Sequence, residues 1–258
     1  MTVVLKAFKY SGSKTRYLTC YKRPPRYVRR VVEPYLGSGA FVLNAMNTLG
    51  VDGIGYEVSS EIVSLWRWLQ LSRPQDIYDL DRLVVDTYRR KGRFDVRDLD
   101  IHQGALTYLR LHVCAIPRGL LRGYLLMPNL KLPVATTIAS LPIVRRLKVV
   151  HASGHSHLED GRDFWFIDPP YVINTDRTSV TDAIKTSGYS DDALAYQPAQ
   201  TQRLLERIER SGIMTYGSRA KRVFPSLAWR PVDVRGVGGN NHQTSYRVEH
   251  VAYLNDWT

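Results

Sequence analysis

The tetrapeptide D-P-P-Y at residues 168–171 combines residue types that can hold an amino group. It follows the apolar run F-W-F-I at 164–167, which predicts a buried strand. Two prolines make the turn rigid and remove two backbone N–H donors. The groups left to face a ligand are the Asp168 carboxylate, the Pro169 carbonyl and the Tyr171 ring. Acceptors beside an aromatic ring suit a planar group with an exocyclic amine, such as adenine or cytosine.

A glycine-rich turn, E-P-Y-L-G-S-G-A-F at residues 33–41, lies between an apolar run at 28–32 and a helical pattern at 42–49. Glycines let the backbone approach a ligand closely, with a helix N-terminus behind them. Taken alone, this turn is equally compatible with a plain tight connection. Glu57 ends the next predicted strand, about 20 residues on, where nucleotide-binding sheets hydrogen-bond a ribose. The turn and the acid together favour a nucleotide site.

The elements that must position these residues alternate between strands and helices. Such a series predicts an α/β fold with a mostly parallel, Rossmann-like sheet. The carboxyl ends of its strands would gather the glycine turn, Glu57 and D-P-P-Y at one edge. The other predicted elements are a strand over 51–56, a helix from Ser59, helices over 76–97, 106–114 and 200–210, and strands over 213–216, 231–234 and 248–254.

The net charge of +12 is concentrated in two blocks. Residues 1–32 contain nine basic residues and no acid, and residues 101–158 contain seven and no acid. Such blocks indicate a polyanionic partner, most often nucleic acid, although a solvated basic face is the alternative. Residues 67–155 also differ in composition from the rest. We therefore predict an insert at 67–155 within a catalytic domain formed by 1–66 and 156–258.

The two cysteines, Cys20 and Cys114, cannot form a disulfide framework, which favours a reducing compartment. No apolar run approaches the roughly 20 residues of a membrane span. We expect a cytoplasmic protein. Three histidines at 151, 155 and 157 match no common zinc spacing, so no metal site is predicted.

The order of the motifs resembles the Dam-type DNA adenine-N6 methyltransferases. In that family a K-[WY]-x-G-x-K segment precedes E-P-[FY]-x-G-x-G-x-x-F, then an acid, then D-P-P-Y. This chain has K-Y-S-G-S-K at 9–14, the turn at 33–41, Glu57 and D-P-P-Y in the same order. The resemblance implies a Rossmann-like methyltransferase sheet with a mostly helical target-recognition insert. Where the family usually has Asp-Ile-Asn, this chain has E-V-S at 57–59.

The resemblance also implies roles for matching residues. The cofactor would be S-adenosylmethionine, with Lys14 near its carboxylate and Glu57 at its ribose. Asp168 and the Pro169 carbonyl would hold the adenine amino group, and Tyr171 would stack on the flipped base. The implied catalytic residues are Asp168, Pro169, Pro170 and Tyr171, and the implied cofactor-binding residues are Tyr10, Lys14, Glu33, Pro34, Tyr35, Gly37, Gly39, Phe41, Glu57 and Asp168.

The insert contains R-G-L-L-R at 118–122 and Pro133, which resemble the N-G-L-x-R hairpin and later N-V-P of the family. Arginine on a hairpin suits reading guanine in the major groove, with phosphate contact as the alternative. Arg118 replaces the family's asparagine, so the GATC target of the family is not assumed. The predicted contacts to double-stranded DNA are Arg118, Arg122, Lys131 and Arg110.

Two rival functions stay open at this point. One is an amino methyltransferase that acts on RNA adenine or on cytosine N4. The other is a catalytically silent homologue that only binds DNA. The expected setting is a bacterial or phage-infected cell, in association with the nucleoid, with a role such as restriction protection or phage self-marking.

Overall fold

The computed structural model describes residues 4–10, 13–114, 124–126, 131–157, 161–170, 196–209, 211–216, 220–235 and 246–255. These residues contain a seven-stranded sheet with strand order β3-β2-β1-β4-β5-β7-β6. The strands are β1 (Arg30–Glu33), β2 (Asp52–Glu57), β3 (Lys148–His151), β4 (Asp163–Ile167), β5 (Gly212–Tyr216), β6 (Arg230–Arg235) and β7 (Tyr246–Leu254). The helices are α1 (Ala40–Leu49), α2 (Ser60–Leu71), α3 (Pro74–Lys91), α4 (Gln103–Leu109), α5 (Val134–Val144), α8 (Pro198–Leu205) and α9 (Ala220–Val223).

The first five strands are parallel, and β7 runs antiparallel between β5 and β6. The order β3-β2-β1-β4-β5 is the one found in dinucleotide-binding sheets. The prediction of an α/β fold with a mostly parallel, Rossmann-like sheet is therefore confirmed. The glycine turn follows β1, Glu57 is the last residue of β2, and Asp168 follows β4. Because these strands are neighbours and parallel, the three features meet at one edge of the sheet.

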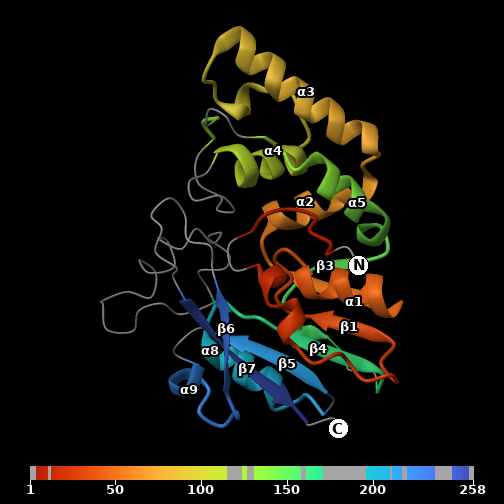
Figure 1. Cartoon of the computed structure of the whole chain (residues 1–258), viewed down its shortest axis with the longest axis vertical. Helices are drawn as coiled ribbons and strands as arrows, with labels where there is room; N and C mark the ends of the chain where they lie inside the picture. The colour runs from red at the N-terminus through yellow and green to blue at the C-terminus, as the bar shows by residue number, and fades with distance from the viewer. Residues whose placement is uncertain are drawn as a thin grey trace.

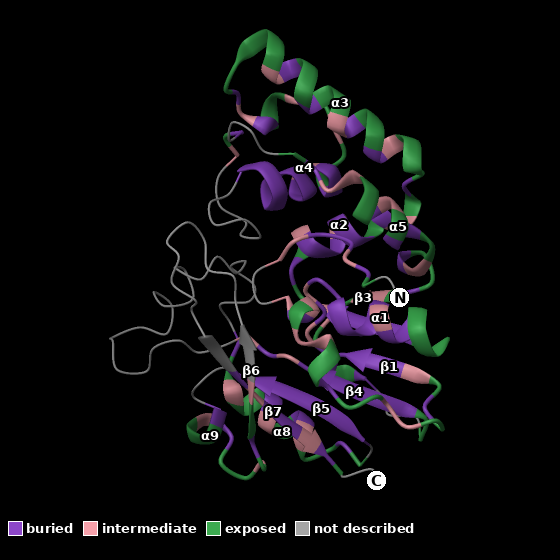
Figure 2. Cartoon of the chain, in the orientation of Figure 1, coloured by how far each residue is buried: buried purple, intermediate pink, exposed green. Residues whose placement is uncertain are grey.

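Both faces of the sheet are covered by helices, as Figures 1 and 2 show. Successive side chains of a strand point to opposite faces. In β4, Phe164 and Phe166 pack into the core under α1, α2 and α5. Trp165 and Ile167 pack with α8 and α9 on the other face. This double burial explains why the strand reads as an unbroken apolar run.

The insert stands beyond α2 in Figure 1, where α3 and α4 form the end of the molecule farthest from the sheet. The strand β3 belongs to the sheet and pairs with β2, whereas the sequence analysis assigned its residues to an insert ending at 155. Its side chains are exposed or only half-buried, so the strand lacks the apolar run by which the others were predicted. The insert therefore returns to the sheet before residue 148.

Two predicted helices of the insert are present with shifted bounds. The first, predicted over 76–97, is α3 and ends where Gly92 adopts a φ of 67°. The second, predicted over 106–114, is α4 followed by a π-helical turn, η4 (Arg110–Cys114). No helix among the described residues is long and apolar enough to cross a membrane.

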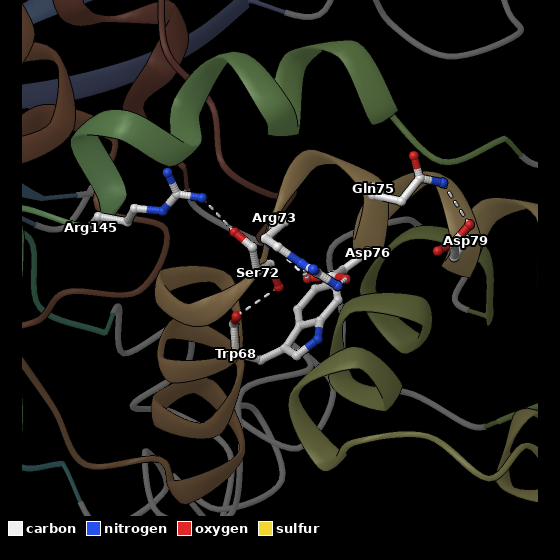
Figure 3. Close-up of polar contacts among 7 residues, drawn as sticks. All are labelled: Trp68, Ser72, Arg73, Gln75, Asp76, Asp79 and Arg145. Atoms are coloured by element: carbon white, nitrogen blue, oxygen red, sulfur yellow. Dashed lines mark hydrogen bonds and ion pairs between the residues drawn. The ribbon is translucent and has the colours of Figure 1, made fainter.

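The junction between α2 and α3 is tied down by polar contacts (Figure 3). The Ser72 hydroxyl donates to the Trp68 carbonyl over 2.7 Å, and Arg145, just past α5, donates to the Ser72 carbonyl over 2.7 Å. Asp76 accepts from the Arg73 backbone N–H and so caps the first turn of α3. The two ends of the insert therefore lie against each other where it leaves and rejoins the rest of the α/β domain.

A buried network of charged and polar side chains surrounds Asp163 and connects several segments of the sheet. Asp163, at the start of β4, is fully buried and accepts from the Arg30 Nε and Nη2 over 2.7 and 2.9 Å. His157 Nε2 lies 2.9 Å from the same carboxylate, and its Nδ1 lies 2.7 Å from the Tyr56 hydroxyl. This network joins the segment after β3 to β1, β2 and β4.

We expect Asp163→Ala to lower the free energy of unfolding by about 3–5 kcal/mol, because it removes the fully buried carboxylate that contacts both Arg30 and the buried His157. Asp52 pairs in register with Arg30 on the other neighbouring strand but is exposed, so Asp52→Ala is the matched control. The control should change stability by less than about 0.5 kcal/mol. Urea unfolding of both variants measures the difference, and equal effects would contradict the assignment.

Candidate active site

A pocket opens at the carboxyl edge of β1, β2 and β4. Its empty volume is about 1080 Å³, open solvent included. Segments far apart in the sequence meet there. The lining residues are Tyr10, Ser13, Lys14, Glu33, Pro34, Tyr35, Leu36, Gly37, Ser38, Ala40, Phe41, Tyr56, Glu57, Val58, Ser153, His155, Phe166, Asp168, Pro170, Tyr196 and Gln200.

The glycine turn forms the floor between β1 and α1. Gly37 and Gly39 have φ angles of 45° and 58°, which side chains other than glycine rarely adopt. The Trp66 Nε1–H donates to the Gly37 carbonyl over 3.0 Å, and its ring packs against Gly39. The Tyr10 ring lies against Gly37. The turn is thus fixed by α2 on one side and by the N-terminal segment on the other.

The carboxylate of Glu33 occupies the N-terminus of α1. It is buried and accepts from the Val42 backbone N–H over 2.8 Å. Burial raises the pKa of Glu33 well above its ordinary value, against the opposing effect of the backbone hydrogen bonds. A helix N-terminus normally binds the pyrophosphate in dinucleotide-binding sheets. Here a protein carboxylate already takes these donors, so the pocket does not suit a phosphate at that place.

The second acid, Glu57, lies at the end of β2 beside the turn. Its Oε2 accepts from the Gly37 backbone N–H over 3.1 Å, and its Oε1 accepts from the Ser59 backbone N–H over 2.9 Å. Burial raises the pKa of Glu57, while these hydrogen bonds act in the opposite direction. The carboxylate therefore links the glycine turn to the start of α2 and lines the pocket at the position predicted for a ribose.

The third acid, Asp168, is held on both of its oxygens. The Thr215 hydroxyl of β5 donates to Oδ1 over 2.8 Å, and the Lys14 ammonium donates to Oδ2 over 2.7 Å. The same ammonium lies 3.2 Å from Glu249 Oε1 on β7. Lys14 was predicted to lie near a cofactor carboxylate; among the described residues its partners are these two protein carboxylates.

The wall formed by α8 carries a cluster of hydroxyl groups. The Tyr35 and Tyr196 hydroxyls each lie 2.7 Å from Thr201 Oγ1, and the two rings meet edge to face. Burial raises the pKa of Tyr35 to about 12, so its hydroxyl stays neutral. His155 closes this side, and burial lowers its pKa.

Several of these functional neighbours were missed by the sequence analysis. Thr215 and Glu249 lie within predicted strands, and Trp66 lies within a predicted helix. A polar side chain within a buried apolar strand was the available signal, because such a group must have a partner. Trp66 gave no signal beyond its apolar helical spacing.

The predicted DNA-binding residues are only partly described. Tyr171, Arg118 and Arg122 lie outside the described residues, whereas Lys131 is exposed just before α5. Among the described residues no group of three or more His, Cys, Asp or Glu side chains is placed to hold a metal ion.

Arg110, predicted to contact DNA, is instead buried at the start of η4. It forms an ion pair with Glu61 in the first turn of α2. Its guanidinium also lies over the Tyr124 ring, 4.2 Å from the ring centroid. The side chain is 7% exposed, so its charge is directed into the protein rather than toward a phosphate. Because Arg110 lies in a block of sequence without acids, the sequence did not indicate its partner Glu61, which is 49 residues away.

Comparison with known proteins gives only distant likenesses. No family model matches the chain, and no curated protein matches it in sequence. A Thermoplasma acidophilum crystal structure has a TM-score of 0.34 at 8% identity, covering 87% of this chain and 77% of that one. A Listeria monocytogenes protein provisionally described as a class I S-adenosylmethionine-dependent methyltransferase has a TM-score of 0.39 at 9% identity, covering 93% and 58%. A conserved hypothetical protein of Streptococcus pyogenes has a TM-score of 0.32 at 12% identity, covering 88% and 86%. Likenesses this distant assign no activity.

We expect Glu33→Gln to change the pH dependence of stability. The raised pKa of Glu33 means that its contribution to the free energy of unfolding is full below its ordinary value of 4.5 and is lost as the pH rises through the folded-state pKa. Glutamine keeps an acceptor for the Val42 N–H but carries no charge. The variant should therefore gain stability relative to the unmodified protein when the pH is raised from 5 to 8, because only the unmodified protein loses this contribution above pH 4.5. Urea unfolding at both pH values measures this, and a constant difference would contradict it.

A second expectation concerns Arg110. Arg110→Met should lower the free energy of unfolding by roughly 1–3 kcal/mol, since it removes a charged hydrogen bond to Glu61. It should leave the salt dependence of DNA binding unchanged. Lys131→Met, at an exposed position, should do the reverse, with unfolding unaffected and the slope of log K against log salt reduced by about 1. A reduced slope for the Arg110 variant would overturn the buried assignment.

Proposed function

We propose that this protein is an S-adenosylmethionine-dependent methyltransferase. The observation that carries the proposal is that one pocket holds the glycine turn, Glu57 and Asp168 at adjoining strand ends. A nucleoside without phosphates fits it, because Glu33 already occupies the N-terminus of α1.

In this proposal, different residues of the pocket would contact different parts of the cofactor. Glu57 would accept from the ribose hydroxyls, and the turn around Gly37 would allow close approach to the nucleoside. Tyr10 would pack against the ligand from the N-terminal segment. When bound, S-adenosylmethionine supplies an electrophilic methyl group on a positively charged sulfur.

The methyl acceptor, in this proposal, is the N6 amino group of a flipped adenine in double-stranded DNA. Its lone pair is delocalised into the ring, so the nitrogen is a poor nucleophile. The Asp168 carboxylate and the Pro169 carbonyl would accept its two hydrogens and favour a more pyramidal nitrogen. Extruding the base costs a few kcal/mol, offset in part by stacking on Tyr171. Transfer breaks the bond from methyl to sulfur, forms one to N6 and releases a proton.

DNA would be bound through the insert and its basic residues. Arg118, Arg122 and the exposed Lys131 are the proposed contacts, with Arg110 removed from the set because it is buried. All three belong to the connection between β2 and β3, which would carry the recognition element. Contacts to phosphate would supply affinity, and contacts to base edges would supply the target sequence.

The test is Asp168→Asn, which keeps the size of the side chain but removes its charge. We expect transfer of labelled methyl to DNA to fall by at least about 100-fold, because a correctly held group at the reacting centre is lost. Cofactor binding, measured by calorimetry, should persist. Asp52→Asn, at the other end of the sheet, should retain full activity.

Undiminished transfer by the Asp168 variant would overturn the assignment. Nucleoside analysis of the modified substrate separates the rival acceptors. N6-methyladenine in DNA is the expected product, whereas methylated RNA or N4-methylcytosine would replace the acceptor but keep the cofactor. Cofactor binding without any turnover would indicate a silent DNA-binding homologue.

A further inference from the structure

The ring of Tyr124, close after the segment proposed to contact DNA, is held by two arginines. Arg118 and Arg122 stand six and two residues before it in the sequence. The Cζ of Arg97 lies 4.5 Å from the ring centroid, and the Cζ of Arg110 lies 4.2 Å from it. A cation over an aromatic ring is attracted by the partial negative charge of the ring face. The half-buried ring of Tyr124 is therefore bound by two cation–π contacts.

Each of these two arginines is also paired with a carboxylate. Arg97 Nη2 lies 2.6 Å from Asp95 Oδ2, and Arg110 forms its ion pair with Glu61. Two cations that share one ring repel each other, and the two carboxylates offset that repulsion. Asp95 caps the short helix η3 (Val96–Asp98), whereas Glu61 lies in the first turn of α2. The ring therefore joins the segment after α3 to the start of α2.

The backbone around Tyr124 is fixed as well. Its carbonyl accepts from the Val96 N–H over 2.9 Å, and the Leu126 N–H donates to the Phe94 carbonyl over 2.9 Å. These two hydrogen bonds form a short antiparallel bridge. Phe94, Val96 and Leu126 are buried in the core. Both the main chain and the side chain thus hold Tyr124 in place.

We propose that Tyr124 is a positioning residue for DNA recognition, and that Arg97 and Arg110 fix it in this role. The inference rests on the proposed function, in which Arg118 and Arg122 contact DNA. A chain advances by at most about 3.6 Å per residue, so fixing Tyr124 limits where a base or a phosphate can meet Arg122. Contacts that distinguish ligands must be placed to within about 0.5 Å. The two cation–π contacts supply this placement from a residue that need not touch DNA.

Arg110 also connects this ring to the cofactor pocket. Its partner Glu61 follows Ser59, whose backbone N–H donates to Glu57 Oε1 over 2.9 Å, and Glu57 lines the pocket. Arg110 directly follows α4, which packs so closely on α2 that a Cβ on Gly104 would lie 2.4 Å from a backbone oxygen of α2. The recognition segment and the pocket are thereby held in a fixed relation. Methyl transfer needs such a relation, since the base and the methyl group must meet about 3 Å apart.

The experiment compares Tyr124→Leu with Tyr124→Phe in the full chain. Leucine removes the ring, whereas phenylalanine keeps both cation–π contacts and loses only the hydroxyl. Sequencing of methylated adenines in DNA from cells that express the unmodified chain identifies its preferred site. The substrates are then a duplex with this site and duplexes that each carry one altered base pair.

We expect Tyr124→Leu to lower the discrimination in kcat/KM against at least one altered duplex by about 10-fold, because one well-placed base contact discriminates by roughly 5- to 150-fold. Tyr124→Phe should keep every ratio within about twofold of the unmodified protein. Unchanged discrimination by Tyr124→Leu overturns the proposal, and so do equal losses in both variants.

Arg97→Met tests the same contact at a side chain that is 63% exposed, so the fold should persist. It should lower the discrimination by about two- to fivefold, as expected for one exposed cation–π contact. The slope of log K against log salt should stay unchanged, because a positioning residue neutralises no phosphate. A slope reduced by about 1 would make Arg97 a phosphate contact and overturn its role. Arg89→Met, at an exposed site in the last turn of α3, is the matched control and should leave the discrimination unchanged.

Amide hydrogen exchange gives a readout that needs no methyl transfer. In the protein alone, Tyr124→Leu should accelerate exchange of the Val96 and Leu126 amides, with the amides of β4 unaffected, and Tyr124→Phe should change neither. Acceleration in β4 as well would mean a general loss of stability and would overturn the role in recognition. If the unmodified protein methylates no DNA, the proposed function fails and this role fails with it. A loss of discrimination confined to Tyr124→Leu and Arg97→Met cannot arise in that way.

Discussion

One ammonium group, that of Lys14, is the contact through which the site is assembled. It joins the N-terminal segment to Asp168 after β4 and to Glu249 on β7, residues that are 154 and more positions away in sequence. Buried charges persist only when they are paired and hydrogen-bonded. The lysine therefore ties the first turn of the chain to the carboxyl edge of the sheet, and its burial draws the residues around Tyr10 over the glycine turn.

At this edge of the sheet, protein carboxylates accept the backbone hydrogen bonds that a phosphate receives in dinucleotide-binding sheets. Glu33 and Glu57 accept from backbone N–H groups of the glycine turn and of the two helices that follow it. These acids stiffen the turn from within. As a consequence the turn is already ordered before any ligand arrives, and the donors of α1 are no longer available to an anion. This Rossmann-like sheet is therefore not arranged to receive a phosphate at the N-terminus of α1.

The sequence predicted an element and its functional residue best where a buried apolar strand runs directly into a polar motif. The run F-W-F-I followed by D-P-P predicted β4 and the place of Asp168, because burial on both faces makes four successive residues of this strand apolar. The edge strand β3 was missed since its half-exposed side chains show no pattern. The partners of Lys14 and Arg110 were beyond prediction, because each pair joins segments that are far apart in the sequence and meet only in the folded chain. A charge in an acid-free segment can thus be fully compensated by a distant acid.

The whole insert lies within a single crossover, the one from β2 to the edge strand β3. An edge connection crosses no other connection, so its length can change without rearranging the strand order. Its two ends meet where Arg145 donates a hydrogen bond to the Ser72 carbonyl. Variation in the length of this connection would therefore keep the strand order of the sheet. It would not be neutral for packing, because the helices of the insert share one continuous apolar core with α1, β1 and β4.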